Sequence, residues 1–199
     1  MAAGALLSRA VELCLLDGLD PAAFDPLTDA ELPLVLRDFA AQSGDRRLAA
    51  VPRLLDRFAG RKLLKRCFVA GLAGHEAIQD ELVRRFVENQ PQRLEVEREI
   101  ARALGLADPS AVIVYCPKKA MQLKEARVLV RRAGRGIAPL DAGAGELPML
   151  AQMLRDYRYL WKLYVFIPPR PREEMAEAGR TAAAVLREFF PEIRNAYRP

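Results

Sequence analysis

A basic stretch directly after the apolar residues 111–115 holds the densest group of side chains capable of binding chemistry. It contains Lys118, Lys119 and Lys124. Ligands commonly bind in loops at the carboxyl end of a strand, and lysine ammonium groups hold phosphate as point charges. The stretch has no glycine-rich phosphate-binding motif, so a solvated surface loop explains it equally well. Both interpretations stay open: an anion or nucleotide site, and a plain basic loop.

A second candidate site is a sheet face formed by alternating side chains on two predicted strands. Cations beside aromatic rings suit phosphate contact and base stacking, but they suit a protein interface equally. The helical first third of the chain could also cover this face, and we favour an interface or internal packing over nucleic acid. The face would carry Arg127, Leu129 and Arg131 on one strand, and Lys162, Tyr164 and Phe166 on the other.

Histidine and cysteine offer little further chemistry. The single histidine, His75, excludes a multi-histidine metal centre built from this chain alone, and a structural role at a helix start is favoured. The three cysteines lie in apolar surroundings without a C-x-x-C motif, which predicts buried free thiols in a reducing compartment. Acidic pairs fall on predicted exposed helix faces, so no general acid or base is assigned.

The overall composition is that of a soluble globular protein. The chain has 199 residues, of which 51% are hydrophobic and 29% are charged, enough for one domain or a domain with a helical appendage. No apolar run approaches the ~20 residues of a membrane-spanning helix. Arg9 and Glu12 interrupt the apolar start, which does not read as a signal peptide. We therefore expect a cytoplasmic protein, whose net charge of +5 mildly favours anionic partners.

The elements that must position these side chains divide into two parts. Apolar residues at helical spacing predict helices over about 5–17, 28–43 and 45–59, the second starting with a capping box at Thr28–Glu31. After Gly60 the pattern alternates between strands and helices. Strands are expected at 62–69, 111–115, 126–131 and 160–167, and helices at 75–87, 91–104, 147–157 and 172–190.

This order predicts an α+β fold. With the two middle helices taken as one broken crossover, the second part reads β-α-β-β-α-β plus a terminal helix, which is the ferredoxin-like order. We expect an antiparallel sheet with helices on one face and the other face open. The predicted division is a helical segment at 1–58 and an α+β domain at 60–199.

Three sequence blocks, in this order, resemble a known family. They are L-T-D-A-E-L at 27–32, L-L-D-R-F-A-G-R-K-L-L-K-R at 54–66, and V-I-V-Y-C-P-K-K-A-M-Q-L-K-E-A-R-V-L-V-R at 112–131. Together they are similar to the carboxyl-terminal half of HD-domain phosphohydrolases of the dGTP-triphosphohydrolase-like group. The resemblance covers about residues 6–190. It implies that 1–58 is a remnant of the helical catalytic core and 60–199 the phosphohydrolase-associated region.

The resemblance carries over basic positions but no catalytic ones. The family's metal site uses a His, a His-Asp pair and a further Asp upstream of the matched region, and this chain has no His-Asp pair. We therefore expect no catalytic residue and no cofactor here, with a divalent metal only in an intact family member. The matching basic positions are Arg61, Lys62 and Lys65 in one block, and Lys118, Lys119, Lys124, Arg127 and Arg131 in the other.

The preferred function is therefore that of a non-catalytic, carboxyl-terminal part of an HD-type phosphohydrolase. Its role would be structural, oligomerising or nucleotide-positioning, and the chain could be a fragment, a split-gene product or a true module. Expected partners are an HD catalytic core, in cis or in trans, or further copies of the chain, with a nucleotide as a candidate ligand and no membrane. The alternatives are a free-standing ferredoxin-like module for nucleotide or nucleic acid, and an interaction subunit that docks on a separate HD core. Whether the chain is an enzyme stays open.

Overall fold

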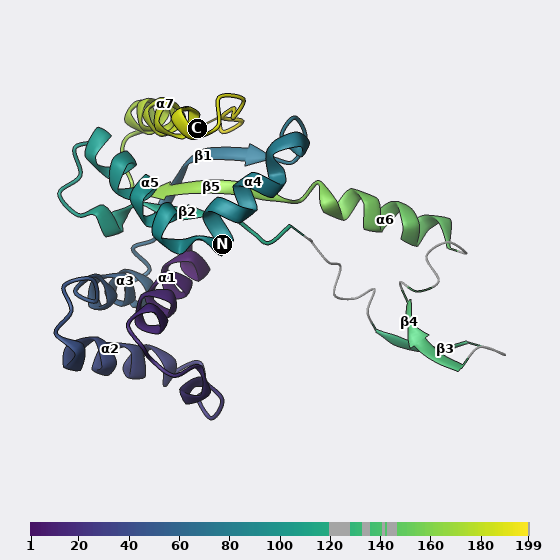
Figure 1. Ribbon diagram of the computed structural model, residues 1–199, viewed down its shortest axis with the longest axis horizontal. Coiled ribbons are helices and arrows are strands. Elements are labelled where there is room, and N and C mark those ends of the chain that lie inside the picture. The colour runs from purple at the N-terminus through teal and green to yellow at the C-terminus, as the bar shows by residue number, and fades with distance from the viewer. Residues whose placement is uncertain (120–127, 133–135, 141, 143–146, 199) are drawn as a thin grey trace.

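A layer of helices forms the first part of the molecule, as the periodicity predicts. The structure is a computed structural model that describes residues 1–119, 128–132, 136–140, 142 and 147–198. The apolar faces of the helices turn inward, and Leu6, Leu36 and Leu55 are almost completely buried. The elements of this layer are α1 (Ala2–Leu16), a short 3-10 helix (Pro21–Phe24), α2 (Leu32–Ser43) and α3 (Ala50–Ala59) (Figure 1).

Local signals set the ends of these helices. Glu31 Oε2 accepts hydrogen bonds from the backbone nitrogen and the hydroxyl of Thr28, both at 2.8 Å, and α2 begins at the next residue. The helix ends where Gly44 takes a φ of 67°, a left-handed conformation that costs glycine little. Pro52 lies in the first turn of α3, where its missing N–H is not needed.

A three-stranded antiparallel sheet lies at the centre of the molecule. Its strands are β1 (Lys65–Gly71), β2 (Ile113–Tyr115) and β5 (Lys162–Ile167), in the spatial order β1-β5-β2. Phe166 of the central strand pairs with Arg66 on one side and Ile113 on the other. Because both outer strands run antiparallel to β5, they are parallel to each other and are joined by a helical crossover.

Helices cover both faces of this sheet. Val114, Leu163 and Val165 contribute to a core shared with the crossover helices and the last helix. Tyr164 and Phe166 point to the opposite face and pack against α1–α3 with exposed fractions of 5% and 2%. The expectation of an open sheet face is therefore wrong, because the helical first third covers it (Figure 1).

The remaining helices of the sheet body follow the predicted order with one change. The predicted helix at 75–87 is divided into a 3-10 turn, a short α-helix and a π-helical segment. The elements are a 3-10 helix (Glu76–Ile78), α4 (Gln79–Val83), a π-helix (Arg84–Glu88), α5 (Gln90–Ala103), a 3-10 helix (Pro109–Ala111) and α7 (Arg172–Phe189).

The outer edge of β1 is sealed by the residues that follow α7. Asn195 Oδ1 accepts a hydrogen bond from the Val69 amide at 3.0 Å, and its Nδ2 donates to the Cys67 carbonyl at 3.2 Å. The amide of Ala196 donates to the Val69 carbonyl at 2.8 Å. These contacts occupy backbone groups that an edge strand otherwise leaves open. Helix α7 passes so close that a Cβ on Gly179 would lie 2.4 Å from the Cys67 carbonyl oxygen.

A hairpin and a helix project away from the body (Figure 1). The hairpin joins β3 (Leu129–Arg132) to β4 (Gly136–Pro139), and α6 (Pro148–Arg158) has no buried residue. We call residues 128–132, 136–140, 142 and 147–160 the arm.

The arm contains a strand that was predicted to belong to the central sheet. The strand expected at 126–131 is β3 in its described part, and it pairs with the neighbouring β4 instead of entering the central sheet. The α+β class is confirmed, whereas the four-stranded ferredoxin-like topology is not. The alternation of side chains predicts a strand but not the strand with which it pairs. Pairing with a strand a few residues away closes a shorter loop, which costs less conformational entropy.

Candidate functional site

A buried network of charges joins α1 to α5. Arg9 and Glu97 form a two-pronged ion pair with nitrogen–oxygen distances of 2.5 and 2.6 Å, and their exposed fractions are 6% and 2%. Glu12 accepts from Arg9 Nε at 3.0 Å and also pairs with Arg93. Such a pair needs this dense set of partners because burying a charge is costly.

Glu97 also fixes the outer edge of the sheet. Its Oε1 accepts a hydrogen bond from the Val114 amide of β2 at 2.7 Å, in addition to the bond from Arg9. One carboxylate therefore connects α1, α5 and β2. Arg93 beside it donates to the Phe86 carbonyl at 2.7 Å. Burial, together with the nearby charge of Arg9, lowers the pKa of Arg93 to about 10, so Arg93 still carries its charge at neutral pH.

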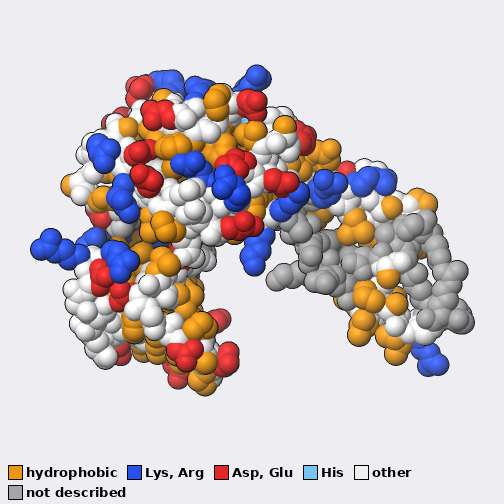
Figure 2. Space-filling view, in the orientation of Figure 1, with side chains coloured by type: hydrophobic (Ala, Val, Ile, Leu, Met, Phe, Trp, Pro, Cys, Tyr) orange, Lys and Arg blue, Asp and Glu red, His pale blue; other side chains and the backbone are white. Residues whose placement is uncertain are grey.

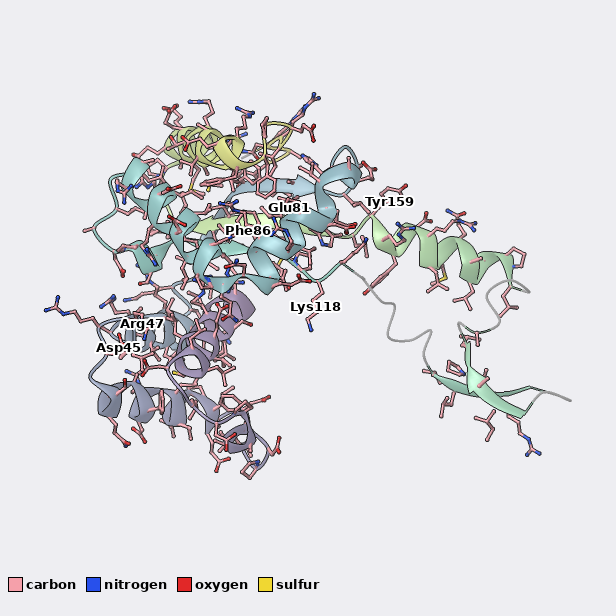
Figure 3. The ribbon with its side chains drawn as sticks, viewed as in Figure 1. Asp45, Arg47, Glu81, Phe86, Lys118 and Tyr159 are labelled. Carbon is pink, nitrogen blue, oxygen red and sulfur yellow. The ribbon has the colours of Figure 1, made fainter. Side chains whose placement is uncertain are left out.

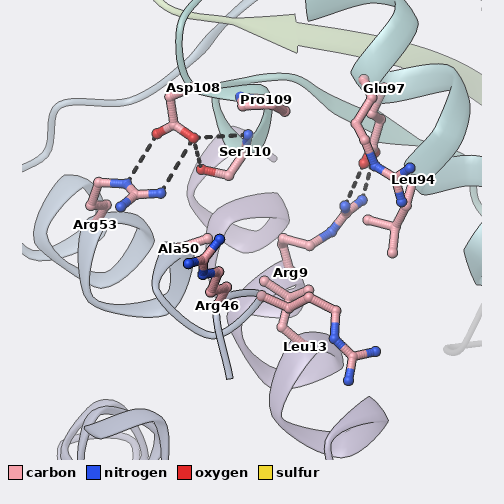
Figure 4. Close-up of a pocket in the computed structure, with 12 residues that line it drawn as sticks. Arg9, Leu13, Arg46, Ala50, Arg53, Leu94, Glu97, Asp108, Pro109 and Ser110 are labelled. Atoms are coloured by element: carbon pink, nitrogen blue, oxygen red, sulfur yellow. Dashed lines mark hydrogen bonds and ion pairs between the residues drawn. The ribbon is translucent and has the colours of Figure 1, made fainter. Parts of the chain in front are cut away.

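A pocket of about 260 Å³ opens beside this network, between α1, α3, α5 and the 3-10 helix at Pro109–Ala111 (Figure 4). Leu13, Ala50, Leu94 and Pro109 give it apolar walls. Five guanidinium groups line it as well, from Arg9, Arg46, Arg47, Arg53 and Arg98.

Three of these arginines have carboxylate partners. Arg9 pairs with Glu97, as described above. Arg53 Nε lies 3.1 Å from Asp108, and Arg47 Nη2 lies 2.7 Å from Asp45, beside which it stands in Figure 3. Each of these ion pairs fixes a guanidinium on the wall and offsets its charge.

Arg46 and Arg98 have no such partner. Both are exposed, both line the pocket, and neither forms an ion pair within the described part of the chain. In Figure 4, Arg46 lies next to Ala50 on the α3 side of the pocket. Guanidinium groups bind oxyanions with paired N–H donors, so the chemistry that this site supports is anion binding.

Asp108 anchors one wall of the pocket. It accepts hydrogen bonds from the Ser110 amide at 3.0 Å and the Ser110 hydroxyl at 2.6 Å, besides its pair with Arg53. Partial burial raises the pKa of this carboxyl, but the hydrogen bonds from Ser110 and Arg53 outweigh that effect and leave the pKa below its usual value. Asp108 is therefore ionised at neutral pH and holds Arg53 in place.

The predicted basic loop is described only in part. Lys118 is exposed and extends away from the sheet (Figure 3). Lys119 is exposed and forms an ion pair with Asp80 at 2.5 Å. Lys124 and Arg127 lie outside the described residues. Arg131 is exposed on β3, in the arm.

The other predicted basic block forms its own group. Arg61, Lys62 and Lys65 line a shallow hollow of about 430 Å³ with Arg57. Lys65 begins β1, whereas Lys118 follows the end of the parallel strand β2. The structure therefore places the two predicted basic groups at opposite ends of the sheet and does not combine them into one site.

The predicted sheet face with cations and aromatic rings does not exist as one surface. Tyr164 and Phe166 are buried under the helical layer, whereas Leu129 and Arg131 are exposed on the hairpin. The internal packing interpretation of the two aromatic residues is confirmed. The reason is that β3 pairs within the arm, so its side chains never meet those of β5.

His75 has a structural role. Its ring is buried, Nδ1 donates to the Gly71 carbonyl at 2.7 Å, and Nε2 accepts from the Arg194 amide at 3.0 Å. Both ring nitrogens are therefore occupied by backbone groups, which does not fit a metal ligand. Within the described residues, no three His, Cys, Asp or Glu side chains are grouped to hold a metal ion.

The three cysteines are buried free thiols, as predicted. Burial raises the pKa of Cys67 and Cys116 to about 12. Burial and the neighbouring Asp17 raise the pKa of Cys14 to about 11. The thiolate is the nucleophilic form, so all three are unreactive at neutral pH.

The arm carries most of the exposed large hydrophobic residues of the described chain, as Figure 2 shows on the projecting part. On α6, Met149 is 78% exposed and Met153, one turn later, 50%. Exposed apolar surface of this kind is a candidate interaction site. The exposed apolar residues of the arm are Val128, Leu129, Ile137, Leu147, Met149, Met153, Tyr159 and Leu160.

Sequence reasoning missed the arginine-lined pocket. Its residues come from separate helices, and no local spacing connects Arg46 with Arg98. One signal was available: Arg9 lies on the apolar stripe of α1, and Glu97 lies between Val96 and Ile100 on the buried face of α5. A charge on a buried face requires a partner of opposite sign, so these two could have been paired.

The described chain is an α+β fold with an arginine-lined pocket and an arm of exposed apolar side chains. Comparison with known families then identifies its relatives: the chain matches the family described as HD associated region over residues 2–187 and belongs to that family. No curated protein and no solved structure was found to match it. No described helix is long and apolar enough to cross a membrane.

Proposed function

We propose that the chain is the non-catalytic associated module of an HD-type phosphohydrolase and docks on an HD catalytic core. The family match over residues 2–187 carries this proposal. The predicted division into a remnant of the catalytic core at 1–58 and the associated domain at 60–199 is kept as part of this proposal, and the family match spans both parts. The Arg9–Glu97 pair holds the two together. The reducing cytoplasm suits the three free thiols.

The arm is the proposed docking surface. An isolated two-stranded hairpin is at best marginally stable in water, and so is an isolated helix shorter than about 12–15 residues. The hairpin β3-β4 and the 11-residue helix α6 both lack a cover in the described chain. An HD catalytic core that packs on Met149, Met153 and Ile137 would bury this apolar surface and stabilise the arm.

The test is co-expression of the chain with an HD-domain phosphohydrolase from the same genome, followed by mass measurement of the purified complex. The double substitution Met149→Glu/Met153→Glu should abolish the complex, because it places two charges in the apolar contact. Leu34→Glu on α2 is the matched control, since Leu34 is 61% exposed but lies outside the arm. It should leave the complex intact.

Two outcomes would refute this docking mode. If the arm variant and the control bind the core equally well, the arm is not the contact. If the unmodified chain forms a stable homo-oligomer that the arm variant disrupts, while core binding is unchanged, the arm joins copies of the chain. Circular dichroism of both variants separates these results from misfolding.

A second candidate function is the binding of phosphate or nucleotide at the predicted basic residues. The grouping of Arg61, Lys62 and Lys65 with Arg57 around one hollow favours it. Lys118 and Lys119, with Lys124, Arg127 and Arg131, remain proposed contacts in a separate group. Titration with a nucleotide panel at ~0.1 M salt tests both groups, because binding through charges should weaken as salt rises. Lys118→Ala/Lys119→Ala and Arg61→Ala/Lys65→Ala should each reduce the affinity of their own group.

A further inference from the structure

The pocket between α1, α3 and α5 combines excess positive charge with apolar walls. Its five arginines face two lining carboxylates, Glu97 and Asp108. Arg47 is offset by Asp45, which leaves the guanidinium groups of Arg46 and Arg98 without an ion pair in the described chain. Two uncompensated guanidinium groups at one hollow attract an anion and repel cations.

The walls restrict what kind of anion fits. Leu13, Ala50, Leu94 and Pro109 offer apolar contact, which an inorganic ion would not use. The volume of about 260 Å³ lies just below the ~300–1,000 Å³ typical of pockets for drug-sized ligands, so the ligand is small. Phosphate suits the guanidinium groups because its oxygens accept paired N–H bonds in one plane.

We propose that this pocket binds a small phosphomonoester, with the phosphate between Arg46 and Arg98 and the organic part against Leu13 and Leu94. The Arg9–Glu97 pair forms a fixed floor, because it is buried and its carboxylate is also bonded to Val114. Arg53 is held on the wall by Asp108. The floor of the site is therefore preorganised, which reduces the entropy lost on binding, whereas the other four arginines of the pocket are exposed.

Ligand binding here has a structural consequence. The lining residues come from α1, α3, α5 and the 3-10 helix at Pro109–Ala111. The ligand therefore connects the helical layer to the sheet body, and it stabilises the folded chain by mass action. This inference is independent of the docking proposal, because the pocket residues lie outside the arm.

The experiment uses the full chain and three probes: phenyl phosphate, pyrophosphate and inorganic phosphate, with phenol as the uncharged control. Calorimetry at ~0.1 M salt should show saturable binding of phenyl phosphate and weaker binding of inorganic phosphate, because only the ester fills the apolar walls. Phenol should not bind. Phenyl phosphate should also raise the melting temperature.

The decisive variant is Arg46→Gln/Arg98→Gln, which should weaken phenyl phosphate binding by about tenfold or more through loss of two charged donors. Its matched control is Arg102→Gln/Arg198→Gln, which removes the same charge from exposed positions outside the pocket. The control should bind like the unmodified chain. Both pocket positions are exposed, so the variant should fold normally, and circular dichroism checks this.

Four results would overturn the proposal. The first is no saturable binding of any probe. The second is equal weakening in the pocket variant and the control pair, which would show unspecific attraction to net charge. The third is loss of binding only in Lys118→Ala/Lys119→Ala, which would place the anion on the basic loop. If the pocket variant keeps its phosphate affinity but loses an HD core, the two arginines bind an acidic protein face and the pocket assignment is wrong.

Discussion

Replacement of Glu97 by glutamine tests the importance of the buried network most directly. Glu97→Gln keeps the size of the side chain and an oxygen that can accept from the Val114 amide. It removes the charge that offsets Arg9, which is only 6% exposed. Removing one partner of a buried ion pair costs about 3–5 kcal/mol. Glu12 still contacts Arg9 at 3.0 Å, so the lower end of that range, about 3 kcal/mol, is expected.

The assay is urea unfolding followed by far-UV circular dichroism at neutral pH. Asp56→Asn is the control, because it removes the Arg37–Asp56 pair, whose side chains are 41% and 67% exposed. Exposed pairs contribute about 0–1 kcal/mol. If both variants lower the free energy of unfolding by the same amount, the buried network does not stabilise the fold as argued.

A double substitution separates the ion pair from the backbone bond. Arg9→Met/Glu97→Leu removes both charges, and apolar replacement of a buried pair is often close to neutral. The Val114 amide then loses its acceptor, which costs about 1–3 kcal/mol. We therefore expect the double variant to be at least as stable as Glu97→Gln. A much less stable double variant would contradict the assignment of the main cost to the unpaired Arg9.

Three further predictions concern other parts of the molecule. Gly179→Ala should destabilise the chain by about 1–3 kcal/mol in urea unfolding, because its Cβ would meet the Cys67 carbonyl. Gly4→Ala, at an exposed position in the first turn of α1, should be neutral or stabilising. The three cysteine thiols should resist a thiol reagent at about pH 8 in the native state and react fully in urea; rapid native labelling would contradict their burial. Asp108 has a lowered pKa in the fold, so its stabilising effect should be complete above the unfolded value of about 3.9 and disappear as the pH falls below it. The stability difference between the unmodified chain and Asp108→Asn should therefore shrink from pH ~6 to pH ~3, and a constant difference would contradict the linkage.

The sequence predicted the elements better than their pairing. Helix periodicity and the terminal helix are local signals that the structure confirms. Of the Thr28–Glu31 capping box only the bonds from Thr28 to the Glu31 carboxylate form, and α2 begins after it at Leu32. The partner of a strand is not a local property, so β3 was placed in the wrong sheet. Residues 162–167 did carry a usable signal, because their apolar residues are continuous instead of alternating, which is typical of a strand covered on both faces.

The candidate site was harder to predict for a physical reason. The predicted lysines form dense local groups, and such groups lie on the surface, where solvent satisfies their charges. The pocket arginines are dispersed along the chain, and only the tertiary fold brings Arg46, which precedes α3, and Arg98 of α5 to the same hollow. A basic residue becomes specific for one anion only when the residues around it are fixed, and tertiary structure determines which residues those are.

The contacts of residues 194–196 with β1 and His75 determine where this chain can be truncated. The family match ends at residue 187, yet Asn195 and Ala196 occupy the backbone of β1, and the Arg194 amide completes the bonding of His75. A chain trimmed at the family boundary would leave an unprotected strand edge, and such edges recruit strands from other molecules. Aggregation of the trimmed chain would then result from the exposed edge of β1, not from an unstable core.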